Sequence, residues 1–279
     1  MRISCTTGCF TKMGDIKTVL RAMKEAGFEA YDFNLCKDDK NSFIEETDYI
    51  EKAYALRAFA DKIGIMCNQT HAIFPTWMVG EEEYNATHFP LHERALRITG
   101  ILGGEVCVFH PTSNGTPESN AEVFSRLLPV AKEFNVKIGI ENMFRWDSEK
   151  NMAKFAACSD GKRFKAQMDL LDSQWFVANV DTGHCEVEGL DTSCVEIIRV
   201  LGDRVKALHV QDNNKRTDNH FIPFFGKIDF IEIFKALKEV GYKGDVNLEP
   251  TVPAAFPVEL YPSIMKLMAD IANYLKGML

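Results

Sequence analysis

The chain lacks the long apolar runs that mark a protein for export or for a membrane. It passes from Met1 directly into strand-forming residues, without the roughly 7–15 apolar residues of a signal peptide or the roughly 20 of a membrane span. Its eight cysteines form no C-x-x-C pair, and several lie in apolar runs such as GGEVCVF. We therefore expect a cytoplasmic protein whose cysteines are buried thiols, with no membrane partner.

The sequence also has no linker rich in proline, glycine or serine, and no G-x-G-x-x-G motif after its first strand-like run. The missing motif argues against a dinucleotide-binding fold. The missing linker favours one domain over residues 1–279, because α/β barrels commonly occupy about 250 residues as one unit. Basic residues are outnumbered, and the net charge of −8 argues against a broad nucleic-acid surface, although a local basic groove stays compatible with it.

What the sequence does contain is a series of short β-rich runs separated by stretches of helical periodicity. After the first run, Asp15 is placed to cap a helix and Gly27 to end it. Eight such units divide the 279 residues into about 35 each, which matches a βα unit of roughly 30 or more residues. This alternation predicts a single (β/α)8 TIM barrel. The runs cover residues 3–7, 29–35, 65–70, 105–110, 136–141, 175–181, 205–212 and 245–249.

Polar side chains follow the ends of most of these runs. In a TIM barrel the functional site lies at the carboxyl ends of the strands, so we expect these side chains at one mouth. A single histidine there is more often a hydrogen-bonded packing residue, but five of the seven histidines lie at strand ends or in the loop after the seventh strand. Carboxylates and imidazoles without thiolates suit Mn²⁺, Mg²⁺, Co²⁺ or Zn²⁺. The strand-end residues are His71, His110, Glu141, Asp181, His184, His209 and Glu249.

Five motifs along the chain resemble those of the xylose isomerase-like TIM barrel superfamily. They are IENMF (140–144), VDTGH (180–184), LHVQDN (208–213), DNHFIPFFGKIDF (218–230) and NLEP (247–250). The resemblance is nearest to sugar or sugar-phosphate isomerases and epimerases of the tagatose or psicose 3-epimerase and inosose-metabolising type. It implies a small sugar or polyol derivative as the substrate, a homodimer or homotetramer, and one divalent metal ion held by Glu141, Asp181, His209 and Glu249.

The resemblance also implies a reaction. Moving a carbonyl along a sugar, or inverting the carbon beside it, removes a proton from carbon through an enediolate whose charge a metal ion stabilises. Glu141 and Glu249 are the expected acid/base pair. Basic loop residues are most often solvated, and His184 could instead orient a neighbouring carboxylate. The residues expected to bind substrate are His71, His110, His184, Lys215, Arg216 and His220.

Other activities stay open. A metal-dependent dehydratase would use the same base and metal, whereas a catalytically idle barrel that binds a sugar or a partner is disfavoured by the four metal positions. Endonuclease IV, a zinc phosphodiesterase of the same superfamily, implies three zinc ions, but IENMFRW departs from its Glu-Asn-Thr-Ala-Gly-type segment and the acidic composition disfavours DNA. Its ligand pattern runs here through His71, His110, Glu141, Asp181, His184, His209, Asp218, His220 and Glu249.

Overall fold

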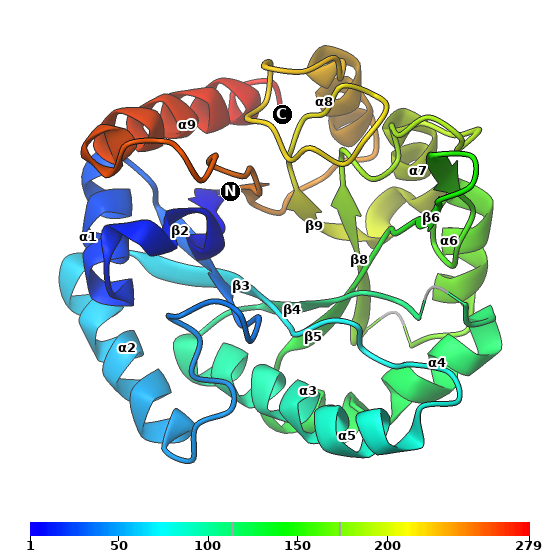
Figure 1. Ribbon diagram of the computed structural model, residues 1–279, viewed down its shortest axis with the longest axis horizontal. Coiled ribbons are helices and arrows are strands. Elements are labelled where there is room, and N and C mark those ends of the chain that lie inside the picture. The colour runs from blue at the N-terminus through cyan, green and yellow to red at the C-terminus, as the bar shows by residue number, and fades with distance from the viewer. Residues whose placement is uncertain (113, 173) are drawn as a thin grey trace.

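The computed structural model describes residues 1–112, 114–172 and 174–279. Over these residues, eight parallel strands form a ring (Figure 1), which confirms the predicted (β/α)8 TIM barrel. Six strands form one sheet in the order β2-β3-β4-β5-β8-β9, and β1 pairs with β10. Bridges from Thr6 to Asp32 and from Val210 to Leu248 join the two sheets. The strands are β1 (Ile3–Cys5), β2 (Ala30–Asn34), β3 (Met66–His71), β4 (Val106–Phe109), β5 (Lys137–Glu141), β8 (Phe176–Asp181), β9 (Val205–His209) and β10 (Val246–Leu248).

The strands end where the polar residues begin. Each strand lies within its predicted run, except that β3 extends one residue further, to His71. Glu141, Asp181 and His209 are the last residues of β5, β8 and β9, and Asp181 pairs with His209 in the register of the sheet. Because neighbouring parallel strands end at the same edge, this register brings the three side chains to one mouth of the barrel.

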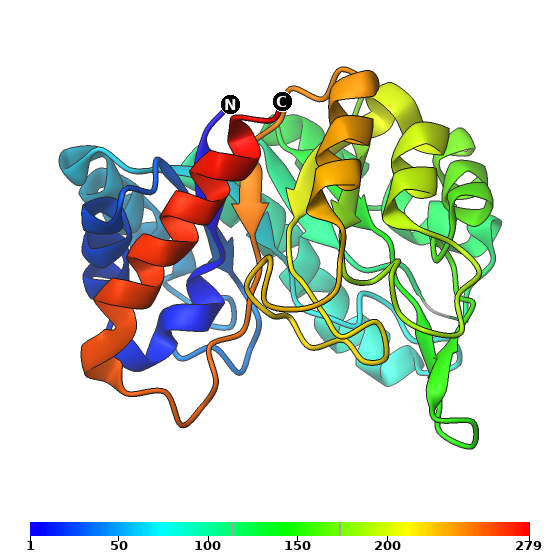
Figure 2. The same ribbon diagram turned by 90° about the horizontal axis from the view of Figure 1, so that it is seen from above.

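Helices cover the outside of the ring (Figure 1, Figure 2). The first of them confirms the predicted ends: the Asp15 carboxylate accepts from the backbone N–H of Thr18 at 2.8 Å, and Gly27 ends the helix with a φ of 108°. Within the described residues, no helix combines the length and the apolar composition needed to cross a membrane. The helices are α1 (Ile16–Ala26), α2 (Tyr49–Ile63), α3 (Glu82–Leu102), α4 (Pro117–Ser125), α5 (Leu128–Glu133), α6 (Gly161–Asp169), α7 (Cys194–Leu201), α8 (Phe230–Glu239) and α9 (Tyr261–Lys276), with 3-10 turns η1 (Thr7–Met13), η2 (Gly202–Arg204) and η3 (Val258–Leu260).

A small hairpin interrupts the regular alternation after β5. Its strands β6 (Arg145–Asp147) and β7 (Met152–Lys154) are antiparallel and pair only with each other. The hairpin projects beyond the barrel at the mouth side (green in Figure 2). It was not predicted, because its strands are only three residues long, too short for a periodic pattern to be recognised.

The interior of the barrel contains a buried polar network below the mouth. Asp32 Oδ2 accepts from Gln69 Nε2 at 3.1 Å and from Asn247 Nδ2 at 2.9 Å. Ser4 Oγ donates to the Asn247 side-chain oxygen at 2.7 Å. All four residues are buried. The network fixes the side chain of Asp32, the one carboxylate among these four residues, beneath the strand-end residues.

Candidate metal centre

Four residues predicted as metal ligands lie together at the mouth of the barrel. Ligand atoms of Glu141, Asp181, His209 and Glu249 all lie within 4.8 Å of one another. His209 Nδ1 is 3.1 Å from Glu141 Oε2 and 3.4 Å from Glu249 Oε2. The side chains of Glu141, Asp181 and His209 are fully buried, whereas that of Glu249 remains 15% exposed.

Buried carboxylate oxygens in this group have no hydrogen-bond partner. Among the described residues, this applies to both side-chain oxygens of Glu141 and to Oδ2 of Asp181. An ionised carboxylate buried in this way is strongly destabilised unless it is paired or coordinates a metal ion. The donor set of three carboxylates and one imidazole, without thiolate, fits Mn²⁺, Mg²⁺, Co²⁺ or Zn²⁺. The four residues are therefore suited to hold one divalent ion.

A second group combines Glu141 with two histidines. His71 Nε2 and His110 Nε2 are 3.0 Å apart and lie 3.6 and 3.5 Å from Glu141 Oε2. His71 Nδ1 lies 2.7 Å from the carbonyl oxygen of Ala72, to which the Nδ1–H donates. Such a backbone bond is typical of histidines that bind a metal through the other nitrogen.

A third group consists of His184, Asp218 and His220. Both histidines place Nε2 beside Asp218 Oδ2, at 3.2 and 3.3 Å. Each directs Nδ1 to a backbone carbonyl, His184 to that of Asn142 at 3.0 Å and His220 to that of Glu249 at 2.8 Å. The same orientation as in His71 thus recurs in this group. The structure therefore brings His71, His110, His184 and His220 to the mouth, as predicted.

The charges at the mouth shift the pKa values of these groups strongly. Burial alone would lower the pKa of His209, but the Glu249 and Glu141 carboxylates outweigh it and raise the pKa well above its usual value. Burial is likewise outweighed at His184, where Asp181 and Asp218 raise the pKa. Burial, with a contribution from Glu141, raises the pKa of Asp181 to about 7. These raised pKa values favour the protonated forms of the three side chains when no cation is bound.

Two residues that sequence reasoning missed organise the groups. Asn142 fixes the end of β8 through two hydrogen bonds. Its side chain accepts from the Asp181 N–H at 2.8 Å and donates to the Asp181 carbonyl at 2.9 Å. Gln211 Nε2 donates to Asp181 Oδ1 at 3.1 Å and to Asp218 Oδ1 at 2.8 Å. Both follow a predicted ligand within two positions and lie in the motifs IENMF and LHVQDN, and this placement is the signal that could have pointed to them.

Two predicted substrate-binding residues lie elsewhere. Lys215 Nζ pairs with Glu186 Oε2 at 3.0 Å, and Arg216 Nε lies 3.6 Å from Glu188 Oε2 with its side chain 78% exposed. The structure does not bring either to the histidine and carboxylate groups. Side-chain oxygens of Asn213 and Asn214 accept from the backbone N–H groups of Lys215 and Arg216, and this turn directs both side chains outward.

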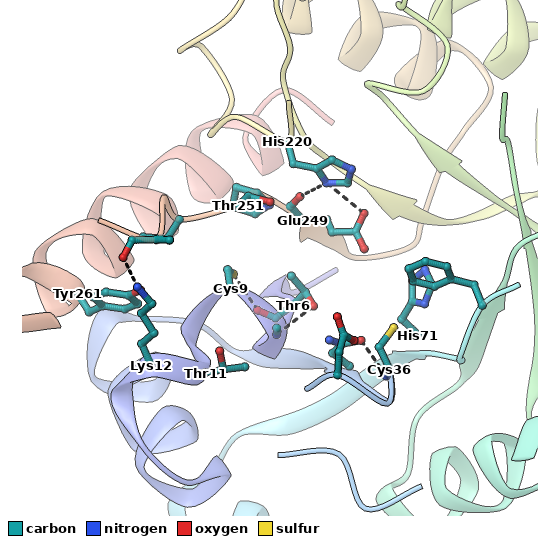
Figure 3. A pocket seen from close by; sticks show the side chains of 17 residues that line it. Thr6, Cys9, Thr11, Lys12, Cys36, His71, His220, Glu249, Thr251 and Tyr261 are labelled. Carbon is teal, nitrogen blue, oxygen red and sulfur yellow. Dashed lines mark hydrogen bonds and ion pairs between the residues drawn. The ribbon is translucent and has the colours of Figure 1, made fainter. Parts of the chain in front are cut away.

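A cavity of about 420 Å³ opens beside the four-residue group. In Figure 3, His71, His220 and Glu249 border it on one side, and Thr6, Cys9, Thr11 and Lys12 border it on the other. The second set comes from the end of β1 and from η1, so the cavity spans the barrel closure. Glu249 is the member of the four-residue group that lines it.

The fold and the carboxylates and imidazoles at the carboxyl ends of its strands place this protein in the class of TIM barrels with a candidate metal site. The chain belongs to the xylose isomerase-like TIM barrel family, whose profile matches residues 20–271. It is 30% identical over 157 residues to an uncharacterized protein of Methanocaldococcus jannaschii, MJ1311, covering 53% of this chain and 51% of that protein. It is 26% identical over 159 residues to a D-psicose 3-epimerase of Enterocloster bolteae, covering 54% and 48%. The chain thus spans about half the length of these curated relatives.

Solved structures share the fold over the whole chain. The IolI protein with a binding zinc atom superposes with a TM-score of 0.77 at 15% identity, covering 100% of this chain and 99% of that one. A D-psicose 3-epimerase with D-tagatose from Clostridium cellulolyticum H10 gives 0.74 at 16% identity, with coverage of 100% and 99%. At these identities the likeness shows the fold. The structural neighbours and the curated relatives include sugar epimerases.

Proposed function

We propose that this protein is a divalent-metal-dependent isomerase or epimerase of a sugar, a sugar phosphate or a polyol-derived ketone, built as one domain over residues 1–279. The observation that supports it most is the group Glu141, Asp181, His209 and Glu249, whose ligand atoms lie within 4.8 Å of one another beside a cavity. The epimerases among its relatives and structural neighbours support the reaction class.

The two glutamates have different surroundings. When bound, a divalent ion would supply Lewis-acid stabilisation of the enediolate. Glu249 lines the cavity and can meet the proton on the carbon beside the substrate carbonyl. Glu141 lies deeper, and although burial opposes ionisation, His209 and the neighbouring histidines hold its pKa well below the usual range. It therefore stays ionised and can remove a proton from carbon, while protonated Glu249 returns one to the enediolate. In the reverse direction the two glutamates exchange these roles.

The cavity suits a small polyhydroxylated molecule. Its volume of about 420 Å³ falls within the range of small-ligand pockets. Thr6, Thr11 and Lys12 offer hydroxyl and ammonium groups along its wall, away from His71. Asn34, which pairs with His71 in the register of the sheet, adds an amide group. These groups can bind sugar hydroxyls while the carbonyl end faces Glu249.

The test is exchange of hydrogen between ketose and solvent. Mn²⁺-loaded protein in D2O is expected to place deuterium on the carbon beside the carbonyl of D-tagatose, D-fructose or L-ribulose, or of a phosphorylated ketose. Glu249→Gln and Glu141→Gln should each abolish exchange with the circular dichroism spectrum unchanged, while Glu259→Gln, an exposed carboxylate on η3, keeps it. Ordinary exchange in either active-site variant contradicts the acid/base pair, and no exchange with any ketose contradicts the proposal.

A second candidate is a zinc phosphodiesterase with three metal ions. The observation that favours it is the presence of the two outer groups, His71–His110–Glu141 and His184–Asp218–His220. Elemental analysis of protein grown with Mn²⁺ and Zn²⁺ separates the two. One ion per chain, unchanged in His71→Ala, fits the isomerase or epimerase. Three zinc ions, reduced in that variant, together with cleavage of an abasic DNA duplex would establish the phosphodiesterase instead. A dehydratase would be recognised by a product whose mass is lower than that of the substrate by one water molecule.

A further inference from the structure

A second cavity, of about 390 Å³, lies between the loop after β4 and the segment that runs from the β6–β7 hairpin into α6. Its wall includes Asn114, Arg145, Phe155, Arg163 and Gln167. None of the candidate metal ligands borders it among the described residues. The cavity is therefore separate from the one in Figure 3, although both open on loops that follow the carboxyl ends of strands.

The wall of this cavity is positively charged in a protein whose net charge is −8. It contains two arginines, and no carboxylate lies among its described lining residues. Arg145 binds neutral oxygens, those of the Phe155 carbonyl at 3.2 Å and of the Asn114 side chain, and makes no ion pair within the described part of the chain. Arg163 pairs with Asp160 and stacks over the Phe155 ring at 4.2 Å. One guanidinium charge is left uncompensated at the cavity.

A buried amide in the wall lacks partners. Gln167 is fully buried, and neither its Nε2 nor its Oε1 has a hydrogen-bond partner in the described structure. Unpaired polar atoms in this setting indicate a missing ligand or water. The amide nitrogen can donate to an anionic oxygen, and the amide oxygen can accept from a hydroxyl. A ligand that carries both kinds of group satisfies both atoms.

Two helix starts add to the same preference. Gly115 and Pro117 line the cavity where α4 begins, and Arg163 lies in the first turn of α6. The N-terminal ends of helices carry partial positive charge, which favours anions. The side chains of Thr116 and Asp160 already accept from the backbone N–H groups of Ser119 and Arg163, so the helix starts contribute through this partial charge. Guanidinium groups bind phosphate oxygens with paired hydrogen bonds. From these observations we propose that the cavity binds the phosphoryl group of a phosphorylated polyol.

The position allows two sources for that group. Arg145 follows Glu141 by four residues, so their Cα atoms are at most about 15 Å apart, and the ring of the intervening Phe144 lies 5.7 Å from that of His184. The phosphoryl group can therefore belong to the far end of a substrate at the mouth or to a separate phosphorylated molecule. The site itself does not depend on the proposed function.

The experiment is a calorimetric titration of the whole protein, first with inorganic phosphate and then with a ketose phosphate. Arg145→Gln is expected to weaken saturable binding at least about tenfold, since a charge-assisted hydrogen bond is lost. Gln167→Leu should also weaken binding. This variant is expected to stay folded, because it replaces unpaired polar atoms by an apolar side chain. Arg199→Gln is the control, because Arg199 is an exposed arginine on α7 paired with Glu239.

Kinetics then separate the sources. If the phosphoryl group is part of the substrate, Arg145→Gln raises KM for a ketose phosphate and leaves KM for the unphosphorylated ketose unchanged. If the ligand is separate, Arg145→Gln abolishes phosphate binding and changes neither KM. Phosphate binding that is absent from the wild type, or that Arg145→Gln and Arg199→Gln affect equally, overturns the proposal. If the wild type binds phosphate but turns over no ketose, the proposed function is contradicted and the proposed phosphoryl site is still supported.

Discussion

Asp32 Oδ2 lies 3.3 Å from His209 Nε2, with both side chains fully buried inside the barrel. The other ring nitrogen of His209 faces Glu141 and Glu249. A carboxylate behind an imidazole fixes the proton on the near nitrogen and leaves the far one as the ligand. We therefore expect Asp32 to orient His209 toward a bound cation, and Gln69 and Asn247 hold Asp32 in turn through hydrogen bonds.

Asp32→Asn should therefore weaken metal binding. The amide keeps the size of the side chain but removes the charge that polarises His209, and changes behind a metal-binding histidine typically cost about 10–100-fold in affinity. Competition with a fluorescent chelator measures the loss. Asp245→Asn is the matched control, because Asp245 is a largely buried carboxylate that pairs with Arg2 at the opposite end of the barrel. Equal affinities in Asp32→Asn and the wild type would contradict the role of Asp32.

Metal binding should release protons at pH 7. The pKa values of His209 and His184 are raised by nearby carboxylates, and that of Asp181 is raised to about 7, so these groups hold protons until a cation displaces them. Affinity is expected to fall as the pH falls, because more protons must then leave. Calorimetry in two buffers with different ionisation enthalpies counts the protons, and a binding heat that is independent of the buffer would refute the prediction.

Gly183→Ala should damage the site through Gln211. A Cβ atom on Gly183 would lie 2.1 Å from Gln211 Nε2, the group that donates to both Asp181 and Asp218. Displacing it is expected to cost about 1–3 kcal/mol of stability and to lower metal affinity. Chemical unfolding and a metal titration measure the two effects. Gly277→Ala meets its nearest atom at 3.3 Å and serves as the comparison; similar behaviour of both variants would exclude this role for Gly183.

His92 is expected to make the fold sensitive to acid. It is fully buried on α3 between the rings of Phe89 and Phe109, and burial lowers its pKa to about 4. The unfolded chain, with an ordinary pKa near 6.5, takes up a proton first as the pH falls from about 6.5 to about 4, so stability is lost over that interval.

The His92 side chain should account for about 2 kcal/mol of the stability lost between pH 7 and pH 4.5. His92→Leu should remove that part of the loss, as measured by urea unfolding at the two pH values. His88→Leu, a partly exposed histidine on the same helix, is the control. An unchanged pH dependence in His92→Leu would show that another group causes the acid sensitivity.

Part of the candidate site could be predicted from sequence because polar residues end short apolar runs. Glu141 and Asp181 close their predicted runs, and His209 lies within the predicted run 205–212, at the residue where β9 ends. The closed ring confirms the fold that brings these strand ends together. Asp32 could not be assigned in the same way. It lies inside a strand-like run, and its partner His209 belongs to another strand on the far side of the ring, a contact that depends on the register of the whole barrel.

Loop residues were harder to place. Lys215 and Arg216 follow β9 and were expected at the mouth, but their direction depends on the side-chain bonds of Asn213 and Asn214, which periodicity does not reveal. The second cavity was missed for a related reason. Arg145 and Gln167 belong to a hairpin and a short helix that meet only in the folded chain.

The pairing of β1 with β10 has a consequence for the order of assembly. Ile3 faces Val246 across the seam, and Glu249 follows that last strand directly. A chain growing at roughly 5–20 residues per second needs on the order of 12–50 s to pass from Ile3 to Glu249. Until then the four-residue group lacks Glu249 and β1 lacks its partner strand β10. During synthesis, closure of the barrel therefore sets the earliest moment at which the protein can retain an ion on all four residues.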